Sequence, residues 1–327
     1  MSDSIASPSP VAPGPPPGAA RNIVFFGPNG LRAGWRLLIF FAILFAIGGT
    51  GVAIARAVAR AHPSPPGGGG GGSAVSVFFS TISELVVFLV LLFVTWIMAK
   101  IEKRKIADYG LPARRAFRAP FWQGAVIGFV ALSVLLLVLR MAGVFYFGPL
   151  SLHGFEILKY GFVWGLAFLF VGFFEEFSFR GYMLFTLSTG IGFWPAAIIL
   201  SFLFGFAHHF NPGETFLGCF SAGSFGFLFC LLLRRTGDLW MAIGFHMSWD
   251  WAESYFYGVA DSGQVAQGHL LNASFHGPVW LTGGTVGPEG SWICLAVLVV
   301  LWLVFSLRLR GAKYPNPAAI PDPRRLR

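Results

Sequence analysis

The sequence predicts an all-α, polytopic membrane protein with about eight transmembrane helices and an intramembrane polar site. Of its 327 residues, 55% are hydrophobic and only 11% are charged, and the mean hydropathy is +0.69. The apolar residues gather in segments of roughly 20 residues, the length with which a helix crosses a bilayer. One such segment contains two adjacent glutamates, Glu175 and Glu176. A charge at this depth costs at least ~2.5–3.5 kcal/mol, so two carboxylates there indicate a function.

The predicted elements follow the apolar segments in chain order. Residues 1–34 begin with a stretch rich in proline, serine and alanine and are expected to form a disordered tail, without the pattern of a cleavable signal peptide. The Pro/Gly stretch 62–72 is expected to be a flexible linker between the first two spans. The expected spans cover residues 37–58, 75–98, 122–141, 158–187, 193–210, 215–233, 239–257 and 292–309.

The distribution of lysine and arginine predicts the orientation of these spans. A cluster of basic residues follows the second span, whereas none occurs between Thr236 and Leu307. Basic loops stay on the cytoplasmic side, so both termini are expected in the cytoplasm and loop 258–291 outside. The expected organisation is an N-terminal pair of spans with a basic loop (35–118), a core (119–257), the external loop (258–291), a last span (292–310) and a basic cytoplasmic tail (311–327).

Charge and cysteine usage exclude two other classes. The net charge of +9 does not indicate nucleic-acid binding, because the basic residues flank apolar spans. The three cysteines, Cys219, Cys230 and Cys294, lie in apolar segments, and none belongs to a Cys-x-x-Cys pair. The sequence therefore supports neither a disulfide framework nor a cysteine-ligated zinc site.

The first polar motif is Glu175-Glu176-Phe-Ser-Phe-Arg180, in the second half of the fourth span. Neighbouring helix residues differ by about 100°, so the two glutamates point in different directions. Glu176 and Arg180 are four residues apart and can pair on one face, which leaves Glu175 to face elsewhere. A desolvated glutamate suits a general base near neutral pH. A purely structural Glu–Arg pair at the membrane interface would also fit this pattern.

Two histidine motifs follow on separate spans. His208 ends the sequence Phe204-Gly-Phe-Ala-His208, shortly before a helix stop at Asn-Pro. His246 and Asp250 are four residues apart, so they share a face, and Asp250 could hold the tautomer of His246. By itself, each motif would also fit a histidine that is hydrogen-bonded for structural reasons. Glu253 is expected nearer the outer interface and outside the site.

In this order, Glu-Glu-x-x-x-Arg, Phe-x-x-x-His and His-x-x-x-Asp resemble the motifs of the CPBP family, the CAAX proteases and bacteriocin-processing proteins of the Rce1-like or Abi type. The resemblance covers about residues 119–257, and the sequence Asp108-Tyr-Gly-Leu111 resembles a short signature that often precedes this core. It implies an intramembrane endopeptidase whose substrate is a peptide or a membrane-anchored protein. The first hundred residues and the segment after Gly258 add no functional motif.

The resemblance also implies roles for the first two motifs. Glu175 and His208 would activate the attacking water, and Glu176 and Arg180 would brace the helix that carries Glu175. Peptide hydrolysis needs a base for the water and donors for the developing oxyanion. No Ser-His-Asp or Cys-His set is evident in the sequence, which favours water over a covalent nucleophile. One difficulty is depth, because simple topology places Glu175 toward the inner half of the membrane and His208 toward the outer end of its span.

In the third motif, the resemblance implies that His246 and Asp250 stabilise the oxyanion. Asparagine is the more familiar last residue of this motif, and an ionised aspartate cannot donate a hydrogen bond. Asp250 would then be protonated, orient His246 or bind a metal. Two histidines and carboxylates suit zinc, with Glu175, His208, His246 and Asp250 as the candidate ligands, but the sequence has no His-Glu-x-x-His motif. No cofactor is therefore certain, and zinc stays an open alternative.

Two rival functions remain at this stage. Intramembrane carboxylates and histidines also build the proton relays of proton-coupled transporters, although the chain shows no internal repeat of the kind that such transporters contain. A non-catalytic immunity or scaffold factor of the same family is the other alternative, and the complete motif set argues against it. The Pro/Gly-rich tail and the lack of organelle-targeting signals favour the bacterial inner membrane as the location. The lipid bilayer is an expected partner and nucleic acid is not.

Overall fold

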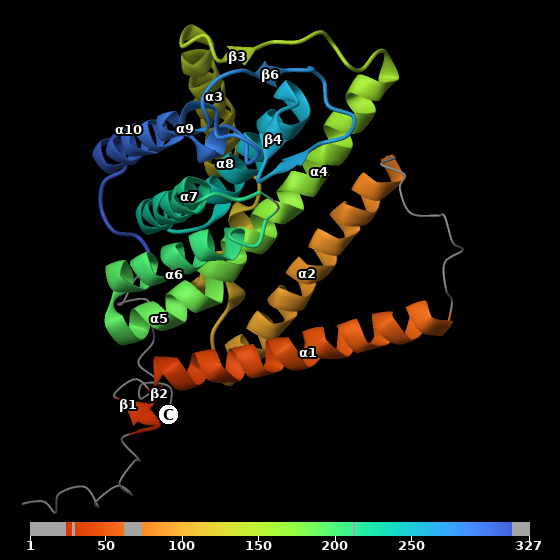
Figure 1. Ribbon diagram of the computed structural model, residues 1–327. Coiled ribbons are helices and arrows are strands. Elements are labelled where there is room, and N and C mark those ends of the chain that lie inside the picture. The colour runs from red at the N-terminus through yellow and green to blue at the C-terminus, as the bar shows by residue number, and fades with distance from the viewer. Residues whose placement is uncertain (1–23, 28–29, 62–73, 212, 316–327) are drawn as a thin grey trace, which may run out of the picture.

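The computed structural model describes residues 24–27, 30–61, 74–211 and 213–315, which are mostly helical (Figure 1). The main helices are α1 (Ala33–Ala61), α2 (Ala74–Ile101), α3 (Ala119–Met141), α4 (Phe155–Phe177), α5 (Leu184–Ile191), α6 (Phe193–His208), α7 (Phe216–Thr236), α8 (Trp240–Asp250) and α10 (Trp292–Arg308). Most of the expected tail and the whole expected linker 62–72 lie outside the described residues. The predicted all-α class is confirmed.

Short elements connect the main helices. They are the strands β1 (Phe26–Gly27), β2 (Gly30–Leu31), β3 (Phe145–Tyr146), β4 (Ala260–Asp261), β5 (Gln264–Val265) and β6 (Ser274–Phe275), the 3-10 helices η1 (Ile106–Tyr109), η2 (Ala113–Arg115) and η5 (Pro288–Gly290), the π-helices η3 (Ser178–Met183) and η4 (Trp251–Tyr257), and the four-residue helix α9 (Val279–Thr282). The strands pair as β1–β2, β3–β6 and β4–β5, all antiparallel.

Five stretches of the described chain are long and apolar enough to cross a membrane, which fits the predicted multi-pass protein. They are Ala33–Gly51, Thr81–Ile101, Ala119–Met141, Phe155–Ile191 and Phe216–Thr236. The fifth and eighth predicted spans correspond to α6 and α10, which are apolar but have only 16 and 17 residues. The seventh corresponds to α8, whose 11 residues continue directly into η4. All eight predicted segments are thus helical, and three of them are shorter than full spans.

The fourth predicted span is one long helical stretch with a kink. From Phe155 to Ile191 it has 37 residues. A straight helix of this length would measure roughly 55 Å, far more than the ~30 Å hydrocarbon core. Gly181, inside η3, has φ −81° and ψ −115°, so the helix bends there. The bend lies a few residues after the two glutamates. π-Helical turns within α-helices are frequent at functional sites.

Glycines allow α3 and α8 to pack with their backbones close together. A Cβ atom at Gly124 would lie 2.0 Å from the Met241 carbonyl oxygen, and one at Gly128 would lie 2.3 Å from that of Phe245. From the other helix, a Cβ at Gly244 would lie 2.1 Å from the Phe121 carbonyl oxygen. Small residues at four-residue spacing allow this approach between membrane helices. The contact fixes the helix that carries the third motif.

The basic loops meet at one end of the bundle. This agrees with the prediction that they lie on the same side of the membrane. Arg115 pairs with the buried Asp238 at 2.9 Å, which links the loop before α3 to the loop after α7. The amide of Lys313 donates to the Arg234 carbonyl, which adds the segment after α10. Burial raises the pKa of Asp238, and the nearby Arg115 opposes this shift. Which face of the membrane this end meets stays a prediction.

The sequence around Gly110 supports the start of α8. Gly110 has φ +87°, a left-handed conformation that favours glycine, and its carbonyl accepts a hydrogen bond from the Leu239 amide at 2.8 Å. Beside it, Glu102 accepts hydrogen bonds from Arg36, at 2.9 Å to Nε, and from Tyr182, at 2.6 Å. Glu102 therefore ties α1 and the end of α2 to the π-helix η3.

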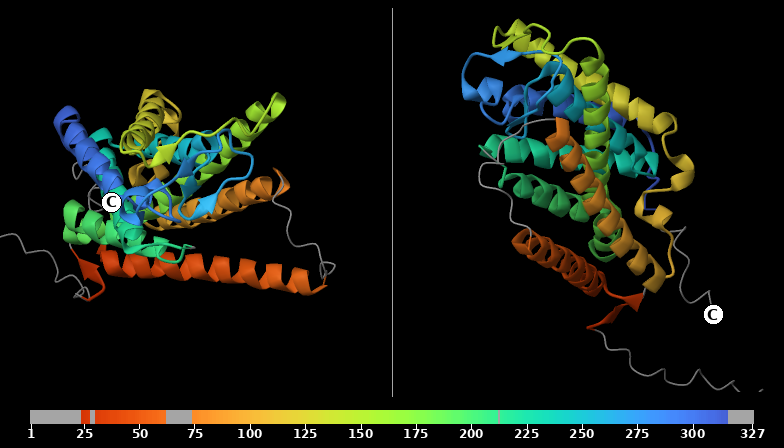
Figure 2. Two further views of the ribbon diagram at one scale, coloured as in Figure 1. Left: turned by 45° about the horizontal axis from the view of Figure 1, so that its top comes forward. Right: turned by 90° about the vertical axis from the view of Figure 1, so that its right-hand side faces the viewer.

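Large apolar side chains face outward over much of the bundle. Examples are Val126, Phe202, Val299 and Leu307, with exposed fractions of 63%, 70%, 59% and 71%. In water, so many exposed apolar side chains would form an aggregation-prone surface, whereas in a bilayer they contact lipid. Figure 2 shows that α3, α6 and α10, which carry these residues, lie on the outside of the bundle. This surface agrees with a protein embedded in a bilayer.

Candidate functional site

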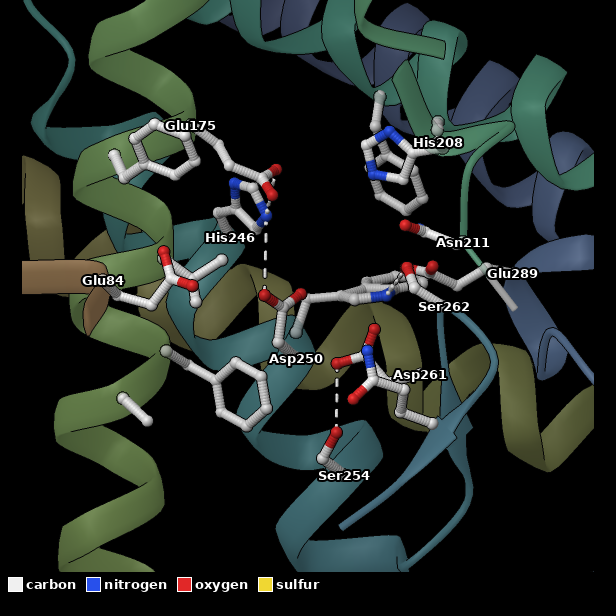
Figure 3. A pocket seen from close by; sticks show the side chains of 18 of the residues that line it. Glu84, Glu175, His208, Asn211, His246, Asp250, Ser254, Asp261, Ser262 and Glu289 are labelled. Atoms are coloured by element: carbon white, nitrogen blue, oxygen red, sulfur yellow. Dashed lines mark hydrogen bonds and ion pairs between the residues drawn. The ribbon is translucent and has the colours of Figure 1, made fainter. Parts of the chain in front are cut away.

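A cavity of about 760 Å³ lies inside the helical bundle (Figure 3). Its volume is in the usual range for ligand sites in proteins. Its polar lining comes from α2, α4, α6, α8 and the segment after Gly258, and includes Glu84, Glu175, His208, Asn211, His246, Asp250, Ser254, Asp261, Ser262 and Glu289. Aromatic rings form much of the remaining wall, from Trp164, Phe168, Phe174, Phe179, Phe204, Phe225, Phe229 and Trp249.

The two glutamates of α4 have different surroundings, as their helical angle predicts. The Glu175 side chain is 24% exposed and faces the cavity, whereas Glu176 is fully buried. Glu176 Oε1 lies 3.3 Å from Arg180 Nη1, which is the predicted pairing along one helix face. The pairing with Arg180 thus involves Glu176 and leaves Glu175 facing the cavity.

Arg180 is buried among aromatic rings. Its guanidinium carbon lies 4.2 Å from the centre of the Phe204 ring, and the other nitrogen, Nη2, has no hydrogen-bond partner in the described residues. The contact places a cation over an aromatic face. Gly226 of α7 leaves the space that this side chain needs, because a Cβ there would lie 2.4 Å from Nη2. Arg180 therefore joins α4, α6 and α7 beneath the cavity.

His246 contacts the carboxylates of both glutamates and of Asp250. Its Nδ1 lies 2.9 Å from Glu176 Oε1, a hydrogen-bond distance. Its Nε2 lies 3.6 Å from Glu175 Oε2 and 3.5 Å from Asp250 Oδ2. The Phe229 ring stacks on the imidazole, with 5.5 Å between centroids. Asp250 was expected to hold the tautomer of His246, but the structure gives the short contact to Glu176.

His208 lies across the cavity from Glu175 and His246 (Figure 3). Its Nδ1 donates to the Phe204 carbonyl at 2.8 Å, because a carbonyl can only accept. This bond leaves Nε2 as the nitrogen for chemistry in the cavity. Glu175 and His208 line the same cavity, although simple topology predicted different depths for them. The structure therefore brings Glu175, His246 and Asp250 together and places His208 opposite them.

The predicted zinc candidates do not converge on one point in the part of the chain that the structure describes. Three-residue groups whose donor atoms all lie within 4.8 Å of one another occur there at Glu253, Asp261 and Glu289, not among the four candidates. Tetrahedral zinc needs its ligands ~2.0–2.2 Å from the ion. With His208 across the cavity, the four candidates do not come together as a ligand set in this arrangement, and zinc stays a prediction.

The sequence did not indicate several cavity residues. Glu84 comes from the first hundred residues, and Asp261 and Glu289 follow Gly258, in regions where the sequence shows no functional motif. Burial raises the pKa of Asp261 to about 6 and, together with the charge of Asp261, raises that of Glu289 to about 8. Glu253, expected near the outer interface, is fully buried. A lone acid in an apolar span is the signal that could have identified Glu84.

Together, the fold and the cavity define a class: a polytopic helical membrane protein with an acid–histidine site enclosed by its helices. Residues 157–252 match the family described as type II CAAX prenyl endopeptidase Rce1-like. This segment contains all three motifs, so the predicted resemblance is confirmed, and the match supports an intramembrane endopeptidase at the family level. No curated protein and no solved structure gives a significant match.

Proposed function

We propose that the protein hydrolyses a peptide bond of a membrane-anchored chain, with water activated by Glu175. The observation that carries this proposal is that Glu175, His208, His246 and Asp250 all line one cavity within the Rce1-like segment. A general base, a histidine across the cavity and a second acid–histidine pair are the groups that peptide hydrolysis requires.

The proposed reaction begins with the water. Glu175, with His208 opposite, takes a proton from the water as its oxygen attacks the scissile carbonyl. His246 in its doubly protonated form, with Nδ1–H held by Glu176, and a protonated Asp250 donate hydrogen bonds to the carbonyl oxygen as negative charge develops there. The proton then passes from Glu175 to the leaving amine, the C–N bond breaks, and a carboxylic acid and an amine remain.

Glu176 and Arg180 have positioning roles in this proposal. Glu176 fixes the ring of His246 through Nδ1, which directs Nε2 toward the cavity. Arg180 balances the charge of Glu176 and is held by the Phe204 ring. Neither side chain is among those that line the cavity. Their effect on the reaction is therefore exerted through His246.

The aromatic wall supports a substrate with an apolar part next to the scissile bond. Phe168, Phe174 and Phe179 line the cavity along the helix that carries Glu175. A lipid-modified or transmembrane segment could contact these rings while the peptide reaches the carboxylates. We propose the bacterial inner membrane as the location, with both termini in the cytoplasm, on the charge distribution of the loops.

The test uses the full chain, purified and reconstituted in nanodiscs. A peptide library is offered in two matched forms, with and without an isoprenoid on a cysteine near the C-terminus, and products are read by mass spectrometry. We expect cleavage by the wild type and its loss in His246→Gln. Equal products from both proteins would refute the assigned site. No products from the wild type, with proton flux across liposomes that His246→Gln abolishes, would favour a transporter instead.

A further inference from the structure

A second group of acids lies beyond Asp250, and two of its three members, Asp261 and Glu289, line the cavity. Glu253 belongs to η4, Asp261 to β4 and Glu289 to η5. One carboxylate oxygen of each lies within 4.8 Å of those of the other two. Like charges this close together repel each other strongly, and more so where water is excluded. Three converging carboxylates therefore need a compensating charge or bound protons.

The hydrogen bonds of the three acids are unequal. Glu289 Oε1 accepts from the Trp249 indole at 2.8 Å, and Asp261 Oδ2 accepts from the Ser254 hydroxyl at 3.0 Å. Figure 3 shows Asp261 and Ser254 side by side at the edge of the cavity. Glu253 is fully buried, and neither of its carboxylate oxygens has a hydrogen-bond partner in the described residues. An acid left without donors at such depth points to a missing ligand.

Protein cations do not supply that ligand. In the described parts of the chain, the ion pairs within 4.0 Å that join a carboxylate to Arg, Lys or His involve Glu102, Glu175, Glu176, Asp238 and Asp250. Glu253, Asp261 and Glu289 take part in none of them. No cation of the described chain therefore balances the charge of an ionised Glu253.

We propose that Glu253, Asp261 and Glu289 bind a divalent cation of the calcium type. All three donors are carboxylate oxygens, which hard cations prefer, and the group includes no nitrogen or sulfur ligand of the kind that favours zinc. Calcium–oxygen bonds of ~2.3–2.6 Å span oxygens that lie up to about 5 Å apart across the ion, in agreement with this group. The ion leaves its remaining coordination positions to water.

The position of the site indicates its role. It joins the π-helix that follows α8 to two segments of loop 258–291, which also line the cavity through Asp261 and Glu289. Trp249 connects the site to α8, because its indole binds Glu289 and its ring lies in the cavity wall. The cation thus fastens the loop wall of the cavity to the helix of His246. This inference does not depend on the proposed peptidase activity.

The test measures metal content and thermal unfolding, not activity. The purified full chain is stripped with a chelator, equilibrated with calcium chloride and analysed by elemental mass spectrometry, with magnesium, manganese and zinc in parallel. We expect about one calcium per chain and a higher Tm with calcium than without. Glu253→Gln, which keeps the shape and breaks no hydrogen bond, should weaken calcium binding at least ~10-fold.

The matched control is Glu84→Gln, which removes a carboxylate from the same cavity but not from the cluster. It should bind calcium like the wild type. Equal calcium binding by Glu253→Gln and wild type would overturn the proposal, as would a wild-type Tm that no cation changes. A parallel loss in Glu84→Gln would also overturn it, because it would show a general attraction of the acidic cavity. If Glu253→Gln does not fold, Glu289→Gln gives the same comparison.

Discussion

The contact between Glu176 and His246 gives a prediction that separates stability from positioning. Glu176 Oε1 contacts both His246 Nδ1, at 2.9 Å, and Arg180 Nη1, at 3.3 Å, while Oε2 has no partner in the described residues. A glutamine can therefore keep both contacts through its carbonyl oxygen. Glu176→Gln alone nevertheless leaves Arg180 as an unpaired buried cation, and losing one partner of a buried pair costs about 3–5 kcal/mol.

Replacing Arg180 at the same time removes this unpaired charge. Glu176→Gln/Arg180→Met and Glu176→Met/Arg180→Met both lack the buried ion pair, so their Tm values should be close to each other and above that of Glu176→Gln. Only the glutamine keeps an acceptor for His246 Nδ1. Loss of a group that orients a functional histidine typically lowers activity ~10–100-fold. We therefore expect the methionine double variant to cleave ~10–100-fold more slowly than the glutamine double variant.

The assay is the initial cleavage rate in nanodiscs, with Tm measured on the same samples. Its decisive comparison is between two proteins that differ only in the residue at position 176. Similar rates at similar Tm would refute the positioning role of Glu176. A slow glutamine double variant would show instead that the charge of the pair, not the hydrogen bond, matters for His246.

Three further predictions follow from contacts described above. Gly124→Ala places a methyl group 2.0 Å from the Met241 carbonyl oxygen and should lower Tm strongly, whereas Gly48→Ala, with nothing within 4 Å, should not. Asp250→Asn should keep at least ~10% of the cleavage rate because the amide is a hydrogen-bond donor, whereas Asp250→Leu should lose far more. Equal rates in these two variants would show that the polar group at position 250 has no role in the reaction. Burial raises the pKa of Glu289 to about 8, so without divalent cations the folded state holds the Glu289 proton more tightly than the unfolded state does. The Tm of the protein should therefore fall as the pH rises from about 5 to 9. This fall should be smaller in Glu289→Gln.

The helices and the motif residues were predictable because they rest on local patterns. Apolar segments of span length predict helices, and charges inside them, such as Glu175, stand out against an apolar background. The boundaries were less certain: α6 was expected to reach Phe210 but ends at His208. The Gly124-x-x-x-Gly128 spacing on α3 was also visible in the sequence and would have predicted the close approach of another helix.

The contacts between elements could not be predicted from the same patterns. Spacing along α8 suggested Asp250 as the partner of His246, because both lie on one helix, but Glu176 of α4 makes the shorter contact. Likewise, nothing in the sequence joins Asp261 and Glu289 to the cavity, since their positions depend on how the loop folds back over α8. Intrahelical pairs can be read from spacing, whereas pairs between helices require the fold.

The proposed reaction depends on Glu175 as the base that activates water, and the initial cleavage rate of Glu175→Gln measures this role. The matched control is Glu156→Gln, an exposed glutamate at the start of the same helix. Glutamine keeps the size of the side chain and removes proton acceptance, so the account predicts a ~10²–10⁴-fold loss for Glu175→Gln and an unchanged rate for Glu156→Gln. A folded Glu175→Gln protein that cleaves at the wild-type rate would contradict it.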